Sequence, residues 1–196
     1  MSPLAGCAAL AVVELDATLV AQTFVSRPFV AGVLFGFLAG SPRDGALIGA
    51  SCELLSLADL PVGGCLTWSA PVAAGVGALL AGSGAPLPVS LAAGLAAGVL
   101  HARAEAYERA YRGRTAGALA ARAAAGGVLG PALGASIAAH AAMTFSVALA
   151  VLLVSSALER RWWALLPDFA RAGMSAAAFA APWIGMAGVA SWGIRR

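Results

Sequence analysis

The sequence has little charge and contains no lysine. Charged residues make up 11% of the 196 residues, whereas 61% are hydrophobic and the mean hydropathy is +0.88. Because a soluble domain carries about 25% charged residues, this composition excludes an ordinary soluble protein. It predicts an all-α polytopic membrane protein, with one membrane-embedded domain that covers residues 1–196.

The sequence also lacks the short motifs of common enzymes and metal sites. It has no zinc-protease, paired-cysteine, nucleophile-elbow or dinucleotide-binding motif. The glycines of residues 126–130 resemble a phosphate-binding loop, but no lysine accompanies them and the segment is apolar. Cys7, Cys52 and Cys65 lack metal-type spacing and are interpreted as small buried hydrophobic residues. We therefore expect no catalytic residue, no metal site and no cofactor.

The first apolar segment, residues 4–25, is long enough to span a bilayer but contains polar side chains. Glu14, Asp16 and Gln22 all lie within it. One charged group at the centre of a spanning helix costs about 2.5–3.5 kcal/mol on insertion scales. The two acids are therefore expected to face protein or water, or to lie near an interface.

The next two apolar runs are each too short to cross a bilayer. Pro28–Ala39 and residues 45–57 are joined by a polar turn at residues 41–44, and the second run contains Glu53. A spanning helix needs about 20 apolar residues, so runs of this length predict a re-entrant hairpin or a broken helix. Short interrupted segments are typical of transporter binding sites, and an ionisable residue within one is a candidate functional group.

Residues 101–125 differ from the rest because they contain five arginines. We interpret them as a polar, alanine-rich helix outside the hydrocarbon, and the positive-inside rule places it in the cytoplasm. A nucleic-acid or lipid-headgroup surface is the weaker interpretation, since only Tyr107 and Tyr111 offer an aromatic platform. We expect the lipid bilayer, and not a nucleic acid, to be the surrounding partner.

Two long apolar segments complete the sequence. Residues 126–158 and 174–194 are predicted to be spanning helices, the second kinked or divided near Pro182. His140 lies inside the first of them. It either takes part in a proton relay or is a packed histidine whose hydrogen bonds are satisfied, and the second interpretation is favoured.

The residues around Glu53 carry a resemblance to a known family, dense over residues 15–64 and thinner elsewhere. The chain resembles the IIC membrane component of the mannose/fructose/sorbose branch of the phosphoenolpyruvate-dependent sugar phosphotransferase system. The matching blocks are Leu15-Asp16 with Gln22, Ser26-Arg27-Pro28-Phe29-Val30-Ala31-Gly32, Gly49-Ala50-Ser51-Cys52-Glu53-Leu54-Leu55 and Leu60-Pro61-Val62-Gly63.

The resemblance implies a sugar permease subunit in the bacterial cytoplasmic membrane. Such a subunit pairs with a IID membrane subunit, is part of an oligomer, and releases a hexose for phosphorylation by cytoplasmic IIA and IIB proteins, so it is not an enzyme by itself. The chain departs from the family pattern where Ser41 and Ser69 stand in place of acids. The alternative is a degenerate, non-transporting or regulatory membrane protein that keeps the IIC fold. A solute carrier unrelated to phosphotransfer shares the composition but not the matching blocks.

Four residues are predicted to bind the substrate. Glu53 would accept hydrogen bonds from sugar hydroxyls, or alternatively cap a broken helix end. Gln22 would contact the sugar or join two helices. Asp16 is the third candidate, although a structural role through a partner such as Arg27 is favoured. Ser51 is a weak fourth candidate, since a small residue there suits helix packing.

Overall fold

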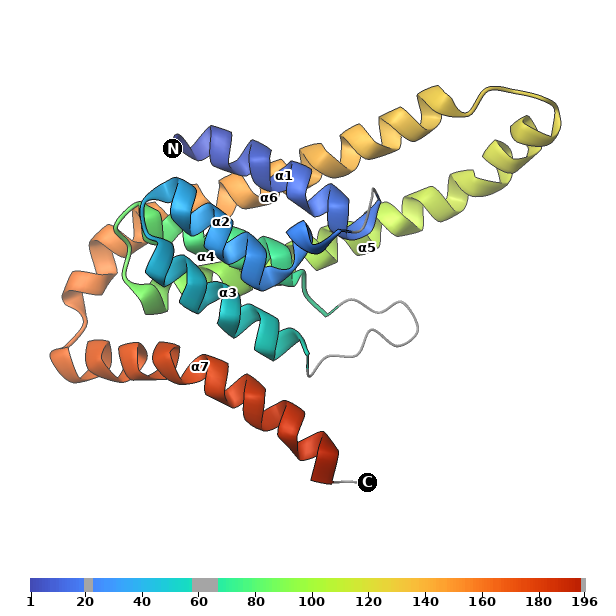
Figure 1. Cartoon of the computed structure of the whole chain (residues 1–196). Coiled ribbons are helices and arrows are strands. Elements are labelled where there is room, and N and C mark those ends of the chain that lie inside the picture. Colours follow the sequence, from blue (N-terminus) through green and yellow to red (C-terminus); the bar gives the residue numbers. More distant parts are fainter. Residues whose placement is uncertain (20–22, 58–66, 195–196) are drawn as a thin grey trace.

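The structure of the chain is a computed structural model that describes residues 1–19, 23–57 and 67–194. These residues form helices joined by short connections, which confirms the all-α prediction (Figure 1). The α-helices are α1 (Pro3–Thr18), α2 (Pro28–Ala39), α3 (Pro42–Ser56), α4 (Ala70–Gly82), α5 (Leu87–Ala124), α6 (Gly130–Trp162) and α7 (Asp168–Ile194), and two 3-10 helices are η1 (Phe24–Ser26) and η3 (Trp163–Leu165).

Within the described ranges, α5, α6 and α7 are the helices that are long and apolar enough to cross a membrane. Residues 4–25 are long enough to span a bilayer but do not form one spanning helix, because α1 ends at Thr18 after 16 residues. A helix of that length is about 24 Å long, less than the roughly 30 Å of a hydrocarbon core. Asp16, in the last turn of α1, binds the segment that follows the helix, as described below.

The two short apolar runs form the predicted hairpin. α2 has the predicted bounds and packs along α3, as Figure 1 shows. The turn is shorter than expected, because α3 begins at Pro42 and not at Gly45. Proline suits the first turn of a helix, and Asp44 in that turn places a negative charge at the helix N-terminus. The hydroxyl of Ser41 donates a 2.8 Å hydrogen bond to the Asp44 carboxylate.

Gly40 ends α2 in the left-handed conformation, with a φ of 89°. The backbone N–H of Ser41 then donates to the carbonyl of Gly36 at 2.8 Å, which closes the turn.

We expect Gly40→Ala to destabilise the protein by about 1–2 kcal/mol, because a side chain is unfavourable at positive φ. The measurement is the midpoint of thermal unfolding in detergent. The control is Gly113→Ala in α5, where an added Cβ meets nothing within 4 Å. That substitution should leave the midpoint unchanged or raise it. An equal response of the two variants would contradict the role assigned to Gly40.

α4 is the centre of the core. It packs against α1, α2, α3, α5 and α6, and almost all its residues are buried. Pro71 lies in the first turn of this helix, where proline does not interrupt the hydrogen bonding. The hydroxyl oxygen of Ser69 caps the helix by accepting from the N–H of Val72 at 3.4 Å. Because these five helices all contact α4, it fixes their positions relative to one another.

α5 and α6 are longer than the core and extend beyond it as a helical arm (Figure 1). The polar, alanine-rich residues 101–124 are the second part of α5, which runs into them without a break. α7 packs mainly on α3, contains Pro182 and begins at Asp168, earlier than predicted.

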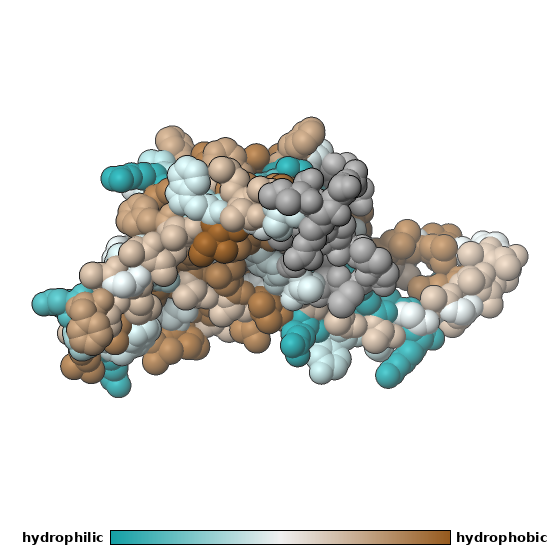
Figure 2. Space-filling view, turned by 90° about the horizontal axis from the view of Figure 1, so that it is seen from below, coloured by the Kyte–Doolittle hydropathy of each residue, from teal (hydrophilic) through white to brown (hydrophobic). Residues whose placement is uncertain are grey.

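Apolar residues cover much of the surface seen in Figure 2, as expected of a protein surrounded by lipid.

Candidate functional site

The open end of the α2–α3 hairpin carries an ion pair. Glu53, in the last turn of α3, binds the guanidinium of Arg27, with 2.5 Å between Oε1 and Nη2. The backbone N–H of Phe29, in the first turn of α2, donates to Oε2 of Glu53 at 3.3 Å. The carboxylate thus joins the two ends of the hairpin, and its side chain is 16% exposed while that of Arg27 is 54% exposed. Both members of the pair therefore remain accessible to a polar ligand.

Asp16 holds the segment that leads into the hairpin. Its carboxylate accepts from the backbone N–H and the hydroxyl of Thr23, both at 2.9 Å, and from the backbone N–H of Ser26 at 3.3 Å. Arg27, the partner expected for Asp16, is paired with Glu53 instead. Asp16 binds backbone N–H groups of the segment that precedes Arg27. Asp16 lies outside the three candidate spans. The N–H of Thr23 and the other donors favour the charged form and hold the pKa of Asp16 below its ordinary value.

Ser51 is not part of this arrangement. Ser51 is 1% exposed, and its hydroxyl donates to the carbonyl of Leu47 at 2.8 Å within α3. It lies two residues before Glu53, so the helix directs the two side chains to opposite faces. Ser51 therefore faces the core. Gln22 lies outside the described residues.

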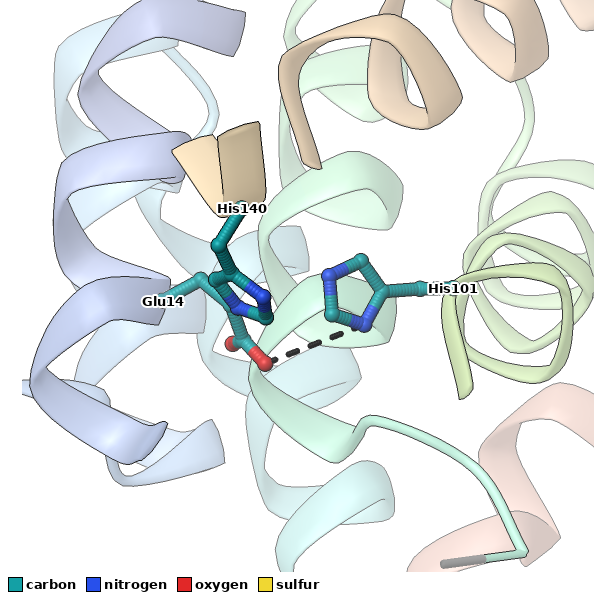
Figure 3. A group of neighbouring side chains, drawn as sticks. All are labelled: Glu14, His101 and His140. Atoms are coloured by element: carbon teal, nitrogen blue, oxygen red, sulfur yellow. Dashed lines mark ion pairs between the residues drawn. The ribbon is translucent and has the colours of Figure 1, made fainter. Parts of the chain in front are cut away.

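A second group of polar side chains lies between α1, α5 and α6. Glu14, His101 and His140 come from these three helices and point toward one another, as Figure 3 shows. Each is at most 2% exposed. Oε1 of Glu14 lies 3.8 Å from Nδ1 of His101, and the two imidazole rings meet edge to face with centroids 5.7 Å apart.

Further polar groups surround this cluster. The Ser69 hydroxyl donates to Oε1 of Glu14 at 3.0 Å, and the carboxylate of Glu108 lies 2.8 Å from Nδ1 of His140. Glu105 is paired with Arg109, four residues later in α5, at 2.6 Å. The buried acid in the first segment faces protein, as predicted for a charge in an apolar segment.

No pattern along the sequence brings these three residues together. The only signals were the acid within an apolar segment and the two histidines of the chain, both inside long helices. The expectation of no metal site was based on spacing along the sequence, and a group contributed by three distant helices has no such spacing.

Fold and site define a multi-pass helical membrane protein with a short internal hairpin whose open end carries a partly exposed ion pair. The family model described as the sorbose-specific IIC component of the phosphotransferase system matches residues 4–192. The chain belongs to this family, which makes it a sugar transport component of that system. No curated protein and no solved structure matches the chain.

Proposed function

We propose that the chain is the permease subunit that translocates a hexose for phosphorylation by a cytoplasmic IIB partner. The observation that carries the proposal is the ion pair at the open end of the hairpin, in a chain of this family. Two short helices place a carboxylate and a guanidinium there without closing them off from solvent. Such interrupted elements are where transporters hold their substrates.

Sugar hydroxyls both donate and accept hydrogen bonds, and the pair offers both kinds of partner. The Glu53 carboxylate accepts from hydroxyls, and the Arg27 guanidinium donates to them. Asp16 supports the site by fixing the backbone of Thr23 and Ser26 just before Arg27. We assign Gln22 as a further sugar contact, and Ser51 contributes by allowing close packing behind Glu53.

The partners follow from the same proposal. The chain would assemble with a IID subunit into an oligomer in the bacterial cytoplasmic membrane, and IIA and IIB would supply the phosphoryl group. Arg112, Arg114 and Arg122 lie toward the far end of α5. By the positive-inside rule, we place this end of the arm on the cytoplasmic side.

The test is equilibrium binding of labelled mannose, fructose and sorbose to membranes that contain this chain and a IID subunit. We expect saturable binding of one of these sugars, competed by the unlabelled sugar and absent from membranes with IID alone. If the complex forms but binds no hexose, the proposal fails and the alternative of a non-transporting protein with the IIC fold is favoured.

A further inference from the structure

We propose that Glu14, His101 and His140 bind one divalent transition-metal ion, best matched by Zn²⁺, and that this ion joins α1 to the α5–α6 arm. The site lies apart from the hairpin ion pair and is not needed for the proposed sugar contacts. The three residues each direct one ligand atom into a common space, and these atoms lie within 4.8 Å of one another (Figure 3). Two imidazoles and a carboxylate form a ligand set that binds zinc in many proteins.

The hydrogen bonds of His101 leave the correct nitrogen free for a metal. The hydroxyl of Thr144 donates to the backbone carbonyl of His140 at 3.1 Å. Its oxygen therefore accepts from the Nε2–H of His101, 2.9 Å away. The proton of the neutral imidazole is thus on Nε2, and Nδ1 carries the lone pair that faces Glu14.

His140 shows the same arrangement with a stronger supporting group. A carboxylate accepts hydrogen bonds, so Nδ1–H of His140 donates to Glu108 at 2.8 Å and Nε2 carries the lone pair. Nε2 is directed toward α1, since it lies 3.2 Å from the hydroxyl of Thr18, one turn after Glu14. That hydroxyl also lies 3.2 Å from the backbone carbonyl of Glu14, to which it would donate when Nε2 binds a metal. A metal-binding histidine commonly donates its other N–H to a carboxylate, which fixes the ring and raises its basicity.

Two buried atoms of the cluster lack a hydrogen-bond partner among the described residues. They are Oε2 of Glu14 and Nδ1 of His101. A proton shared between the two side chains does not satisfy them, because 3.8 Å is too long for a hydrogen bond between Oε1 and Nδ1. A cation placed between them binds both lone pairs.

The charge balance favours a cation in the same place. Glu105 is paired with Arg109, and Glu108 lies 3.7 Å from Arg112, whereas among the described residues no arginine forms an ion pair with Glu14. A buried carboxylate without a positive partner is unfavourable. Zn²⁺ would neutralise it, with Oε2 of Glu14 and the two imidazoles as ligands and a water molecule as the fourth. Tetrahedral ligands at roughly 2.0–2.1 Å from zinc lie about 3.3 Å apart, so the side chains must move inward by about 1 Å.

The test is metal binding to the full chain in detergent, purified with an affinity tag that contains no histidine. The sequence has only two histidines, so no other imidazole can account for binding. After removal of metal with a chelator, we expect one Zn²⁺ to bind per chain and the unfolding temperature to rise. Co²⁺ in its place should show the visible absorption bands of a tetrahedral site. A wild-type protein that binds no Zn²⁺, or gives an octahedral Co²⁺ spectrum, would overturn the proposal.

Variants identify the ligands. Glu14→Gln, His101→Gln and His140→Gln should each abolish stoichiometric binding, and Glu108→Gln should weaken it about 10–100-fold. The matched control is Asp44→Asn, which removes a carboxylate from the hairpin and should retain one Zn²⁺. Equal binding by the wild type and both histidine variants would mean an adventitious ion only. If a variant does not fold, the wild-type stoichiometry and Co²⁺ spectrum still decide the question.

Discussion

Gly32→Ala is expected to prevent stable folding, although it adds a single methyl group. Gly32 lies in α2 where the hairpin helices are in backbone contact. A Cβ at this position would lie 2.5 Å from the carbonyl oxygen of Gly45 and 2.6 Å from the Cα of Gly49, both in α3. Backbone atoms of a packed helix cannot rotate away as a flexible side chain can. α2 and α3 must therefore separate, and the expected cost is about 3 kcal/mol or more.

Separation of the hairpin helices would affect the whole core, because both helices pack against α4. A loss of that size is a large share of the roughly 5–15 kcal/mol that stabilises a typical folded domain. The measurement is the fraction of protein that remains monodisperse in size-exclusion chromatography after heating in detergent. We expect little or no folded Gly32→Ala protein at temperatures where the wild type is intact.

Gly134→Ala in α6 is the matched control. This glycine is also helical, but an added Cβ meets nothing within 4 Å. Alanine is the better helix former by up to about 1 kcal/mol, so the control should be as stable as the wild type or more stable. If Gly32→Ala were equally stable, the close contact between α2 and α3 would be contradicted.

Glu53→Gln is expected to reduce sugar uptake by about tenfold to a hundredfold. The amide has nearly the same shape, but it loses the charge that strengthens hydrogen bonds from sugar hydroxyls. Hydrogen bonds to charged groups are worth about 1.5–3 kcal/mol, and each 1.4 kcal/mol corresponds to a tenfold change. The measurement is the initial rate of labelled-hexose uptake, normalised to the amount of folded protein, with the IID partner present.

A purely structural role for Glu53 makes a different prediction. In that case Glu53→Gln would lower the amount of folded protein and leave uptake per folded molecule unchanged. Asp44→Asn is the control, since Asp44 lies at the other end of α3 and accepts from Ser41. Its uptake per folded molecule should equal that of the wild type. Unchanged uptake in Glu53→Gln would contradict the assignment of Glu53 to the sugar site.

The hairpin was predictable because its determinants are local. The lengths of the two apolar runs and the turn between them are read directly from the sequence, and α2 has the predicted bounds. The start of α3 was missed by three residues, because Pro42 and Asp44 were read as turn residues although both suit a first helical turn. Local pattern thus predicted the existence of these helices better than their ends.

The side-chain partners were less predictable, since they depend on which helices become neighbours. Asp16 was expected to contact Arg27, but the chain presents backbone N–H groups to Asp16 instead. The buried cluster of Glu14, His101 and His140 requires α1, α5 and α6 to meet at one level. No periodicity within one helix contains that information, because it arises from tertiary packing around α4.

The measurement that tests the central proposal most directly is phosphoenolpyruvate-dependent sugar uptake. Cells lacking their own hexose uptake would express this chain with IID, IIA and IIB subunits. We expect labelled mannose, fructose or sorbose to accumulate as its phosphate ester, and accumulation to stop when this chain is omitted. Formation of the membrane complex without accumulation of any hexose phosphate would contradict it.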